Sequence, residues 1–491
     1  MSINLASNNS GTAICWFRDD LRLEDNLAVS AASTYKHVIF IYIDSDEDSG
    51  AWPMGSASRW WLHHSLSSLQ KSIRHLGGDL QIAQGSYKEV FEKIFSEQKI
   101  AAIFWGRRYI ASKLNVDAQI KELAKSRDIF CKSFNNSMLL EPWEVIKDDA
   151  RPYLVYTAFW KTFLKKYRNA EIITRPKILP KSKKTSVACA IDHLNLLPKI
   201  AWDREFYNNW RVGEDAAKNK LESIGSSEIS SYLELRDIPS KDGTCRLSPH
   251  LRFGEVGPRQ VWGHIIKSSN GVSAQKKLSI EQLLKEIVWR EFSYYLLYHF
   301  PHISEQPLRK EFENFPWEED EDKLVKWQKG QTGYPIVDAG MRQLWRTGWM
   351  HNRVRMISAS FLVKHLLVPW QQGARWFWDT LLDADLANNT QGWQWSSGCG
   401  ADAAPYFRIF NPILQGQKFD PDGTYVKRWL PELALSSLDD IHQPWLGGSK
   451  LKTSLKNTKQ QQKYPGPIVD HQVARLQALQ AYDCLKQRAK K

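Results

Sequence analysis

The six cysteines of this 491-residue chain are scattered, and no two of them form a Cys-x-x-Cys pair. This spacing is typical of a reducing compartment and differs from that of a disulfide framework or a zinc site. No apolar run reaches the roughly 18 residues of a membrane span, and the start, MSINLASNNSG, lacks the basic-then-apolar pattern of a signal peptide. We therefore expect a cytoplasmic protein without a metal site or a membrane-spanning segment.

A glycine motif is missing as well. Short β-rich apolar runs, separated by helical patterns such as Ser56–Leu76, recur at Ala13–Phe17, His37–Ile43, Asp79–Gly85, Ile100–Gly106 and Ile129–Phe134. Alternation of apolar strands with helices predicts an α/β domain with a doubly wound parallel sheet. No Gly-x-Gly-x-x-Gly follows the first run, so this domain need not bind NAD or FAD in the manner of the dinucleotide fingerprint.

Tryptophan and positive charge are abundant instead. The chain has 22 tryptophans, and 67 lysines and arginines exceed 54 acids to give a net charge of +13. Such an excess favours a polyanionic partner, with nucleic acid first. Charge alone is equally compatible with a basic protein that simply stays soluble.

The composition changes along the chain. The segment 175–184, RPKILPKSKK, is rich in proline and basic residues and predicts a surface linker rather than a packed element. From about Tyr207 the strand pattern gives way to helical patterns. We predict an α/β domain over 1–136, an interdomain linker over 137–206, and a mostly α-helical domain over 207–491.

Three helices of the last region have recognisable ends. Ser279 and Gln282 form a capping box that predicts a helix start, and Pro301 predicts its end. Pro335 suits the first turn of a second helix. The pattern after His351 predicts a third helix that continues to Pro369.

The stretch DADLANNTQGWQWSSGCG, from Asp383 to Gly400, combines two carboxylates, two asparagines and two tryptophans. A packed core disfavours the acids, and a solvated loop disfavours the tryptophans. A large planar ligand with polar edges would suit both the acids and the tryptophans.

Two helix faces carry a similar mixture. Glu286, Trp289 and Arg290 lie at i, i+3 and i+4, which fits a ligand that stacks and forms hydrogen bonds. An amphipathic helix with an internal salt bridge explains this spacing as well. Asn352 and Met356 are i, i+4 partners among arginines, and a basic surface face is the alternative there.

The segment GTCRLSPH begins at Gly243 and contains Ser248 followed by a proline. This pair predicts a helix start. Its N–H groups, with the hydroxyls of Thr244 and Ser248, would suit a phosphate.

Together these motifs resemble the cryptochrome/photolyase family. The resemblance runs from CWFRDDLRLEDNLA at Cys15 to a C-terminal stretch ending at Tyr482, and includes GTCRLSPHL, WREF, TGYPIVDAGMRQL, TGWMHNRVRM, DADLANNTQGWQW and DAAPYFRIFNP. It is nearest to bacterial photolyases for cyclobutane pyrimidine dimers. SRWWLHHSL and WGRRY favour the class III branch, with class I as the alternative. The resemblance implies an α/β antenna-binding domain and an α-helical domain that binds FAD and DNA.

The resemblance also implies how FAD is held. The phosphates and adjoining groups fall to Tyr232, Thr244, Arg246, Leu247 and Ser248. Cys245 departs from the serine common in the family, so one phosphate contact would come from the backbone. Arg355 and Asp383 would form an ion pair beside the isoalloxazine. Asp385 would contact the ring edge or the ribityl chain.

Asn389 would sit at flavin N5. A neutral amide can accept a hydrogen bond from N5–H and has no acidic proton to give, so it favours the fully reduced flavin that repairs DNA. An aspartate there could supply a proton, as is thought of plant cryptochromes.

Trp393, Trp370 and Trp317 match the family's chain of three tryptophans, which carries electrons from the surface to photoexcited oxidised flavin. A role in core packing is the alternative for each of them. The implied reaction uses neither hydrolysis nor a metal. Light excites reduced FAD, one electron passes to the dimer, the cyclobutane ring opens, and the electron returns.

The resemblance implies that the substrate is ultraviolet-damaged DNA. The dimer would be flipped out of the duplex, as members of the family do with their substrate. Trp289 and Trp395 would stack on it, Glu286 and Asn352 would bind its pyrimidine edges, and Met356 would pack beneath it. The phosphate contacts would come from Arg236, Arg290, Arg353 and Arg408.

The lesion type follows from two of these positions. Family members that repair (6-4) photoproducts carry histidines where this chain has Asn352 and Met356. Repair of that lesion needs a proton donor, which histidine can be and which asparagine and methionine are not. We therefore expect repair of cyclobutane dimers only.

A second, light-harvesting chromophore is expected. Folate-binding class I photolyases carry Asn-Glu where this chain has Ser112 and Lys113, so two folate contacts are missing. The class III stretches still favour a folate such as methenyltetrahydrofolate, with a deazaflavin as the alternative. We expect a monomer without an obligate protein partner.

Two rival functions remain open. A cryptochrome photoreceptor would share the fold, the FAD and the tryptophans while repairing nothing. Asn389 argues against it, as does our expectation of no long extension beyond Tyr482. A light-independent flavoprotein that binds DNA or does redox chemistry would leave WREF and HNRVRM unexplained.

Overall fold

The computed structural model describes residues 10–48, 50–169, 171–268, 274–446 and 464–488. The prediction that a signal peptide is absent was based on the start of the chain, and the first nine residues lie outside these ranges. The described residues form two compact units. The first comprises 1–201, 210–227 and 245–301, and the second comprises 202–209, 228–244 and 302–491. No helix among the described residues has the length and apolarity needed to cross a membrane.

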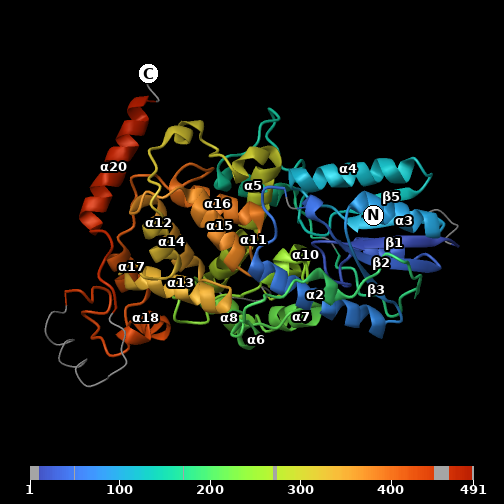
Figure 1. Ribbon diagram of the computed structural model, residues 1–491, viewed down its shortest axis with the longest axis horizontal. Helices are drawn as coiled ribbons and strands as arrows, with labels where there is room; N and C mark the ends of the chain where they lie inside the picture. The colour runs from blue at the N-terminus through green and yellow to red at the C-terminus, as the bar shows by residue number, and fades with distance from the viewer. Residues whose placement is uncertain (1–9, 49, 170, 269–273, 447–463, 489–491) are drawn as a thin grey trace. The chain divides into compact units, whose positions relative to one another are not determined.

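A parallel sheet is the centre of the first unit (Figure 1). Its strands are β1 (Thr12–Phe17), β2 (His37–Asp44), β3 (Leu80–Gln84), β4 (Ile100–Gly106), β5 (Phe130–Phe134) and β6 (Lys181–Ser182). The first five lie in the order β3-β2-β1-β4-β5, all parallel. The order reverses beside β1, which confirms the predicted doubly wound topology and places its switch point between β1 and β4.

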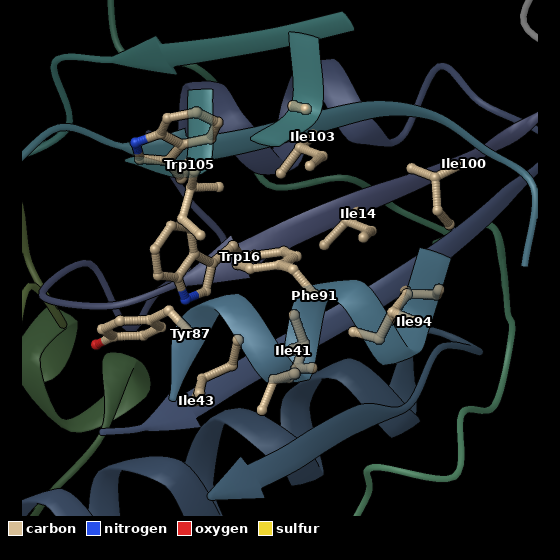
Figure 2. Close-up of a cluster of buried hydrophobic side chains, with 14 of the residues drawn as sticks. Ile14, Trp16, Ile41, Ile43, Tyr87, Phe91, Ile94, Ile100, Ile103 and Trp105 are labelled. Carbon is tan, nitrogen blue, oxygen red and sulfur yellow. The ribbon is translucent and has the colours of Figure 1, made fainter. Parts of the chain in front are cut away.

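The sheet is covered on both faces because its strands are apolar on both. Ile14 and Trp16 of β1 point to one face, where they pack on Phe91 and Ile94 (Figure 2). These two residues belong to α3 (Tyr87–Glu97), and α4 (Ala111–Lys125) completes the same cluster. Phe17 of β1 points to the opposite face and contacts Phe40 there. The helices α1 (Leu27–Ala32) and α2 (Ser56–His75) contact strands of the same sheet.

The rest of the first unit is helical. Its helices are α5 (Tyr156–Lys166), α7 (Glu214–Glu222), α9 (Ser248–Arg252), α10 (Pro258–Lys267) and α11 (Ala274–His299), with 3-10 turns at Asp46–Asp48 and Ile191–Leu194. Two further elements, α8 (Ser226–Leu235) and a 3-10 turn at Pro301–Ser304, each include residues assigned to both units.

The prediction of an unpacked linker over 175–184 is wrong in part. Lys181 and Ser182 form β6, which pairs in parallel with His37 and Val38 at the start of β2. Leu179, just before this strand, is buried. The backbone of an otherwise polar segment thus satisfies its hydrogen bonds at the margin of the sheet.

The regular secondary structure among the described residues of the second unit consists of helices and 3-10 turns. They are α6 (Phe206–Asn209), α12 (Glu321–Gln328), α13 (Pro335–Thr347), α14 (Asn352–Lys364), α15 (Trp370–Thr380), α16 (Leu386–Ser397), α17 (Pro412–Phe419), α18 (Thr424–Trp429) and α20 (His471–Arg488), with 3-10 turns at Lys310–Asn314 and Pro431–Leu433. The two units are defined by their compactness and do not test the predicted domains. The domain limits 1–136, 137–206 and 207–491 therefore remain a prediction.

The predicted helix ends have mixed outcomes. Pro335 is the first residue of α13, and α11 ends directly before Phe300 and Pro301, as predicted. The start at Ser279 is wrong, because α11 already begins at Ala274 and Ser279 is buried inside it. The end of α14 is also wrong, since this helix ends at Lys364, well before Pro369.

Candidate functional site

A buried ion pair lies in the second unit between α14 and the segment before α16. Arg355 Nη2 is 2.8 Å from Asp383 Oδ2, and Arg355 Nε donates to the carbonyl of Met350 at 2.7 Å. Asp383 is largely buried and the guanidinium is only partly exposed. Two fixed contacts hold this arginine in one orientation, so the pair presents a defined pattern of charge to any ligand beside it.

Asp385 and Asn389 lie on α16, just after that pair. Asp385 caps the helix, because its Oδ1 accepts from the N–H of Asn388 at 2.9 Å. Asn389 Nδ2 donates to the carbonyl of Ala374 on α15 at 3.0 Å. With its amino group bound there, the amide of Asn389 has its oxygen left as a hydrogen-bond acceptor.

The three predicted tryptophans lie in neighbouring segments of the second unit. Trp393 is one turn after Asn389 on α16, and its ring packs on the main chain of Gly373 in α15. Trp370 begins that same helix. Trp317 precedes Glu318, whose N–H donates to the carbonyl of Leu367 at 2.8 Å, three residues before Trp370.

The three tryptophans differ in exposure. Trp393 is 2% exposed and Trp370 is 1% exposed, whereas Trp317 is intermediate. Trp370 and Trp393 are therefore buried, and Trp317 keeps part of its surface open to solvent.

Trp393 also has two neighbours that the sequence did not suggest. The ring of Trp327 lies 6.1 Å from it in an edge-to-face arrangement, and that of Phe377 lies 5.0 Å away. Trp327 is fully buried and donates its Nε1–H to the carbonyl of Ser358. These contacts fix the plane of Trp393 and come from helices too distant in sequence to be recognised beforehand.

Two of the predicted phosphate-binding arginines share an acid in the second unit. Arg353 Nη2 is 2.8 Å from Asp237 Oδ2, and Arg236 Nε is 3.9 Å from Asp237 Oδ1. The guanidinium of Arg353 also lies over the ring of Phe419, and that of Arg236 over Tyr232. Asp237, which sequence reasoning missed, therefore offsets part of their charge and orients both.

The other predicted residues of this unit differ in exposure. Asn352 is exposed at the start of α14, and Met356, one turn later, is half-buried with its sulfur 3.9 Å from Arg353 Nη1. Trp395 on α16 is half-buried. Arg408 is exposed, and its carbonyl accepts from Lys364 Nζ at 3.0 Å.

In the first unit, Glu286, Trp289 and Arg290 lie on α11 and each remains partly exposed. Gln282 Nε2 donates to Glu286 Oε1 at 2.7 Å. Arg290 donates to the carbonyl of Ser137 at 2.8 Å, so part of its hydrogen-bonding capacity is used within the chain.

The segment from Thr244 to Ser248 has one unusual backbone angle. Arg246 has a φ of +46°, in the left-handed region that residues with side chains rarely adopt. Ser248 is the first residue of α9 instead of its cap, and the residue at the cap position is Leu247. Such a conformation at a non-glycine residue is found most often where a ligand or close packing requires it.

Lys113 does not point to solvent, although it stands where folate-binding relatives carry an acid. Its Nζ is 2.8 Å from Asp19 Oδ2, beside Arg252 Nη1 at 3.0 Å from Asp19 Oδ1. Burial alone would raise the pKa of Asp19, but Lys113, Arg252 and Arg108 together hold it well below its usual range. Asp19, which follows β1, is therefore held by ion pairs within the chain.

Comparison with known proteins identifies the relationship. Residues 13–180 match the family described as DNA photolyase, and residues 283–484 match the FAD binding domain of DNA photolyase. A deoxyribodipyrimidine photo-lyase of Agrobacterium fabrum is 44% identical over 98% of this chain and 99% of its own length. The chain belongs to the cryptochrome/photolyase family.

Other members of the family agree. The crystal structure of a bacterial class III photolyase from Agrobacterium tumefaciens has a TM-score of 0.92 and 42% identity, covering 99% of this chain and all of that one. Cryptochrome-1 of Arabidopsis thaliana is 38% identical over 89% of this chain and 65% of its own length. The predicted family and the predicted photolyase fold are thereby confirmed.

Proposed function

We propose that this protein is a deoxyribodipyrimidine photo-lyase, which uses blue or near-ultraviolet light to split cyclobutane pyrimidine dimers in DNA. The observation that carries the proposal is the near full-length similarity to a photolyase, together with Asn389 held with its amide oxygen free to accept. FAD is the cofactor of this reaction, as the match to the FAD binding domain indicates.

The residues of the chain fit FAD. Asp385 and the Arg355–Asp383 pair offer fixed charges that suit the polar edge of an isoalloxazine, and Asn389 offers an acceptor for N5–H. The left-handed Arg246, in a segment with two hydroxyls, suits a phosphate-bearing ligand. We assign the remaining contacts to residues of that segment and to α8: Tyr232, Thr244, Leu247 and Ser248.

When bound and reduced, FAD supplies one electron to the dimer after absorbing light. The chain holds the substrate: Trp289 and Trp395 stack on the flipped bases, and Glu286 and Asn352 bind their edges. Met356 gives an apolar floor, and Arg236, Arg290, Arg353 and Arg408 bind phosphates. Arg408 is the exposed member of this set of arginines.

Trp317, Trp370 and Trp393 have a separate role, which is to deliver electrons from solvent to the cofactor before repair. The increase in exposure from Trp393 to Trp317 supports this direction. Core packing explains the burial of Trp370 and Trp393 equally well, so the role in electron transfer is tested by substitution.

A light-harvesting chromophore completes the proposal. Methenyltetrahydrofolate remains favoured and a deazaflavin is the alternative. Since Ser112 and Lys113 stand in place of the Asn-Glu pair and Lys113 is paired with Asp19, we assign the folate contacts to other residues. We further propose a cytoplasmic monomer that needs no protein partner and no metal.

The second candidate is a photoreceptor that does not repair DNA, which the identity to Cryptochrome-1 favours. One experiment separates the two. The purified protein is examined for flavin absorption and incubated with ultraviolet-irradiated DNA in light and in the dark. Loss of dimers in light alone supports the photolyase, and flavin absorption without loss of dimers supports the photoreceptor.

A further inference from the structure

Trp289 is stacked on a tyrosine that no motif suggested. The ring of Tyr156 lies 3.7 Å from that of Trp289, with only 7° between their planes. Tyr156 is the first residue of α5 and is 6% exposed, while Trp289 on α11 keeps part of its surface open. One face of the indole is therefore covered within the first unit.

Tyr156 has two more contacts with the same helix. Its hydroxyl donates to the carbonyl of Lys285 at 2.8 Å, one turn before Trp289. Its ring meets Phe292 edge to face at 5.8 Å, one turn after Trp289. Burial, with a smaller contribution from Glu286, raises the pKa of the phenol well above its usual value, so the hydroxyl stays a donor.

The contacts with Lys285 and Phe292 fix the ring of Tyr156, and the stacking of that ring fixes the plane of the indole. A tryptophan side chain that is already ordered loses little rotational freedom when a base stacks on it, so more of the stacking free energy appears as affinity. An indole without this support would have to be ordered by the ligand itself.

We propose that Tyr156 is a positioning residue, which covers one face of Trp289 and holds the other in the orientation that receives an unstacked pyrimidine dimer. This inference rests on the proposed function, because it takes Trp289 to be a substrate contact. It adds a residue from α5, outside the motifs that carry the family resemblance.

The test compares four variants by their dark affinity for two duplex oligonucleotides of one sequence, with and without a single thymine dimer. Tyr156→Leu removes the stacked ring. Tyr156→Phe keeps the ring and loses only the bond to Lys285. Phe159→Leu is the matched control, since Phe159 is a buried aromatic of the same helix that packs on Phe292 and Tyr295. Trp289→Leu tests the contact itself.

We expect Tyr156→Leu to bind the damaged duplex roughly 3- to 10-fold more weakly, the range expected for releasing one ordered side chain. Its affinity for undamaged DNA should equal that of the wild type, and in repair assays KM should rise more than kcat falls. Tyr156→Phe should restore most of the affinity, and Phe159→Leu should lose none of its preference for the damaged duplex.

The inference is overturned if Tyr156→Leu keeps wild-type affinity for the dimer, or if Phe159→Leu loses as much. If Trp289→Leu binds the dimer normally, the substrate role of Trp289 in the proposed function fails instead. If Tyr156→Leu does not fold, Tyr156→His, with a smaller planar ring, replaces it under the same two criteria.

Discussion

The indole of Trp393 packs directly on the main chain of Gly373, where an added Cβ atom would lie 2.1 Å from Cη2 of the ring and 2.5 Å from Cζ3. Gly373 is one turn after Trp370, and its lack of a side chain lets α15 approach the ring of Trp393. The glycine thus sets how closely α15 packs against the ring of Trp393.

Gly373→Ala should displace Trp393 and destabilise the fold by about 1–3 kcal/mol, as overpacking of a core does. Photoreduction of oxidised flavin should slow in the same variant. Thermal melting and the bleaching of flavin absorption under blue light measure the two effects. Gly392→Ala is the control, because nothing lies within 4 Å of a Cβ there. A normal melting temperature in Gly373→Ala would contradict the close packing.

Trp370→Phe should abolish photoreduction of the isolated protein, because phenylalanine is much harder to oxidise than tryptophan. Repair should survive once the flavin has been reduced chemically, since the electron for repair does not pass through Trp370. Trp160→Phe, a buried tryptophan of the first unit, serves as the control. Normal photoreduction in Trp370→Phe would show that electrons take another route.

The strands could be predicted because each is a short apolar run that ends at polar or glycine residues, as at Ile100–Gly106. β6 was missed because two residues carry no pattern, and its pairing with His37 is a long-range contact. The start of α11 was misplaced because Ala-Gln-Lys-Lys before Leu278 forms helix readily, so the capping residues at Ser279 were not needed.

The family's motifs supplied the predicted site residues, but their partners depend on tertiary packing. Arg353 meets Asp237, and Trp289 meets Tyr156, across more than one hundred residues of sequence. No periodicity links such pairs, so the orientation of a site residue could not be derived even where its identity could.

Glu291, beside Arg290 on α11, should make stability depend on pH. Burial raises the pKa of this carboxyl to about 7, although Arg290 and the N–H groups of Leu139 and Leu140 act to lower it. Between its ordinary value near 4.5 and 7, the unfolded chain ionises this group while the folded chain keeps its proton. Stability contributed by the raised pKa is therefore present below pH 4.5 and is lost as the pH rises through 7.

Glu291→Gln removes this titration. Relative to the variant, the wild type should lose stability on the order of 3 kcal/mol at most between pH 4.5 and 7, measured by thermal melting. Glu281→Gln, an exposed acid of the same helix, should track the wild type over this range. A constant difference between wild type and Glu291→Gln would refute the assignment.

Arg408 should contribute one phosphate contact. Affinity for damaged duplex DNA should fall as salt rises, with a log–log slope of about −0.9 per phosphate, and Arg408→Ala should reduce the magnitude of that slope by about 0.9. Arg375→Ala removes an equal charge from an exposed arginine outside the proposed site, and it should leave the slope unchanged. A salt dependence that is the same in wild type and Arg408→Ala would exclude the contact.

We expect the choice of lesion to depend on residues that hold the substrate without donating a proton. Asn352, exposed at the start of α14, can bind a pyrimidine edge, and Met356 one turn later is apolar and soft. Opening a cyclobutane ring needs only an electron that leaves and returns. A (6-4) photoproduct needs a proton donor as well, and neither side chain is one.

The most direct measurement uses two oligonucleotides of one sequence, the first with a cyclobutane thymine dimer and the second with a (6-4) photoproduct. Each is incubated with the flavin-reduced protein under the same blue lamp and in the dark, and the restored strand is quantified by chromatography. We predict restoration of the cyclobutane strand in light alone and no restoration of the (6-4) strand. Failure to restore the cyclobutane strand in light, or efficient restoration of the (6-4) strand, would contradict it.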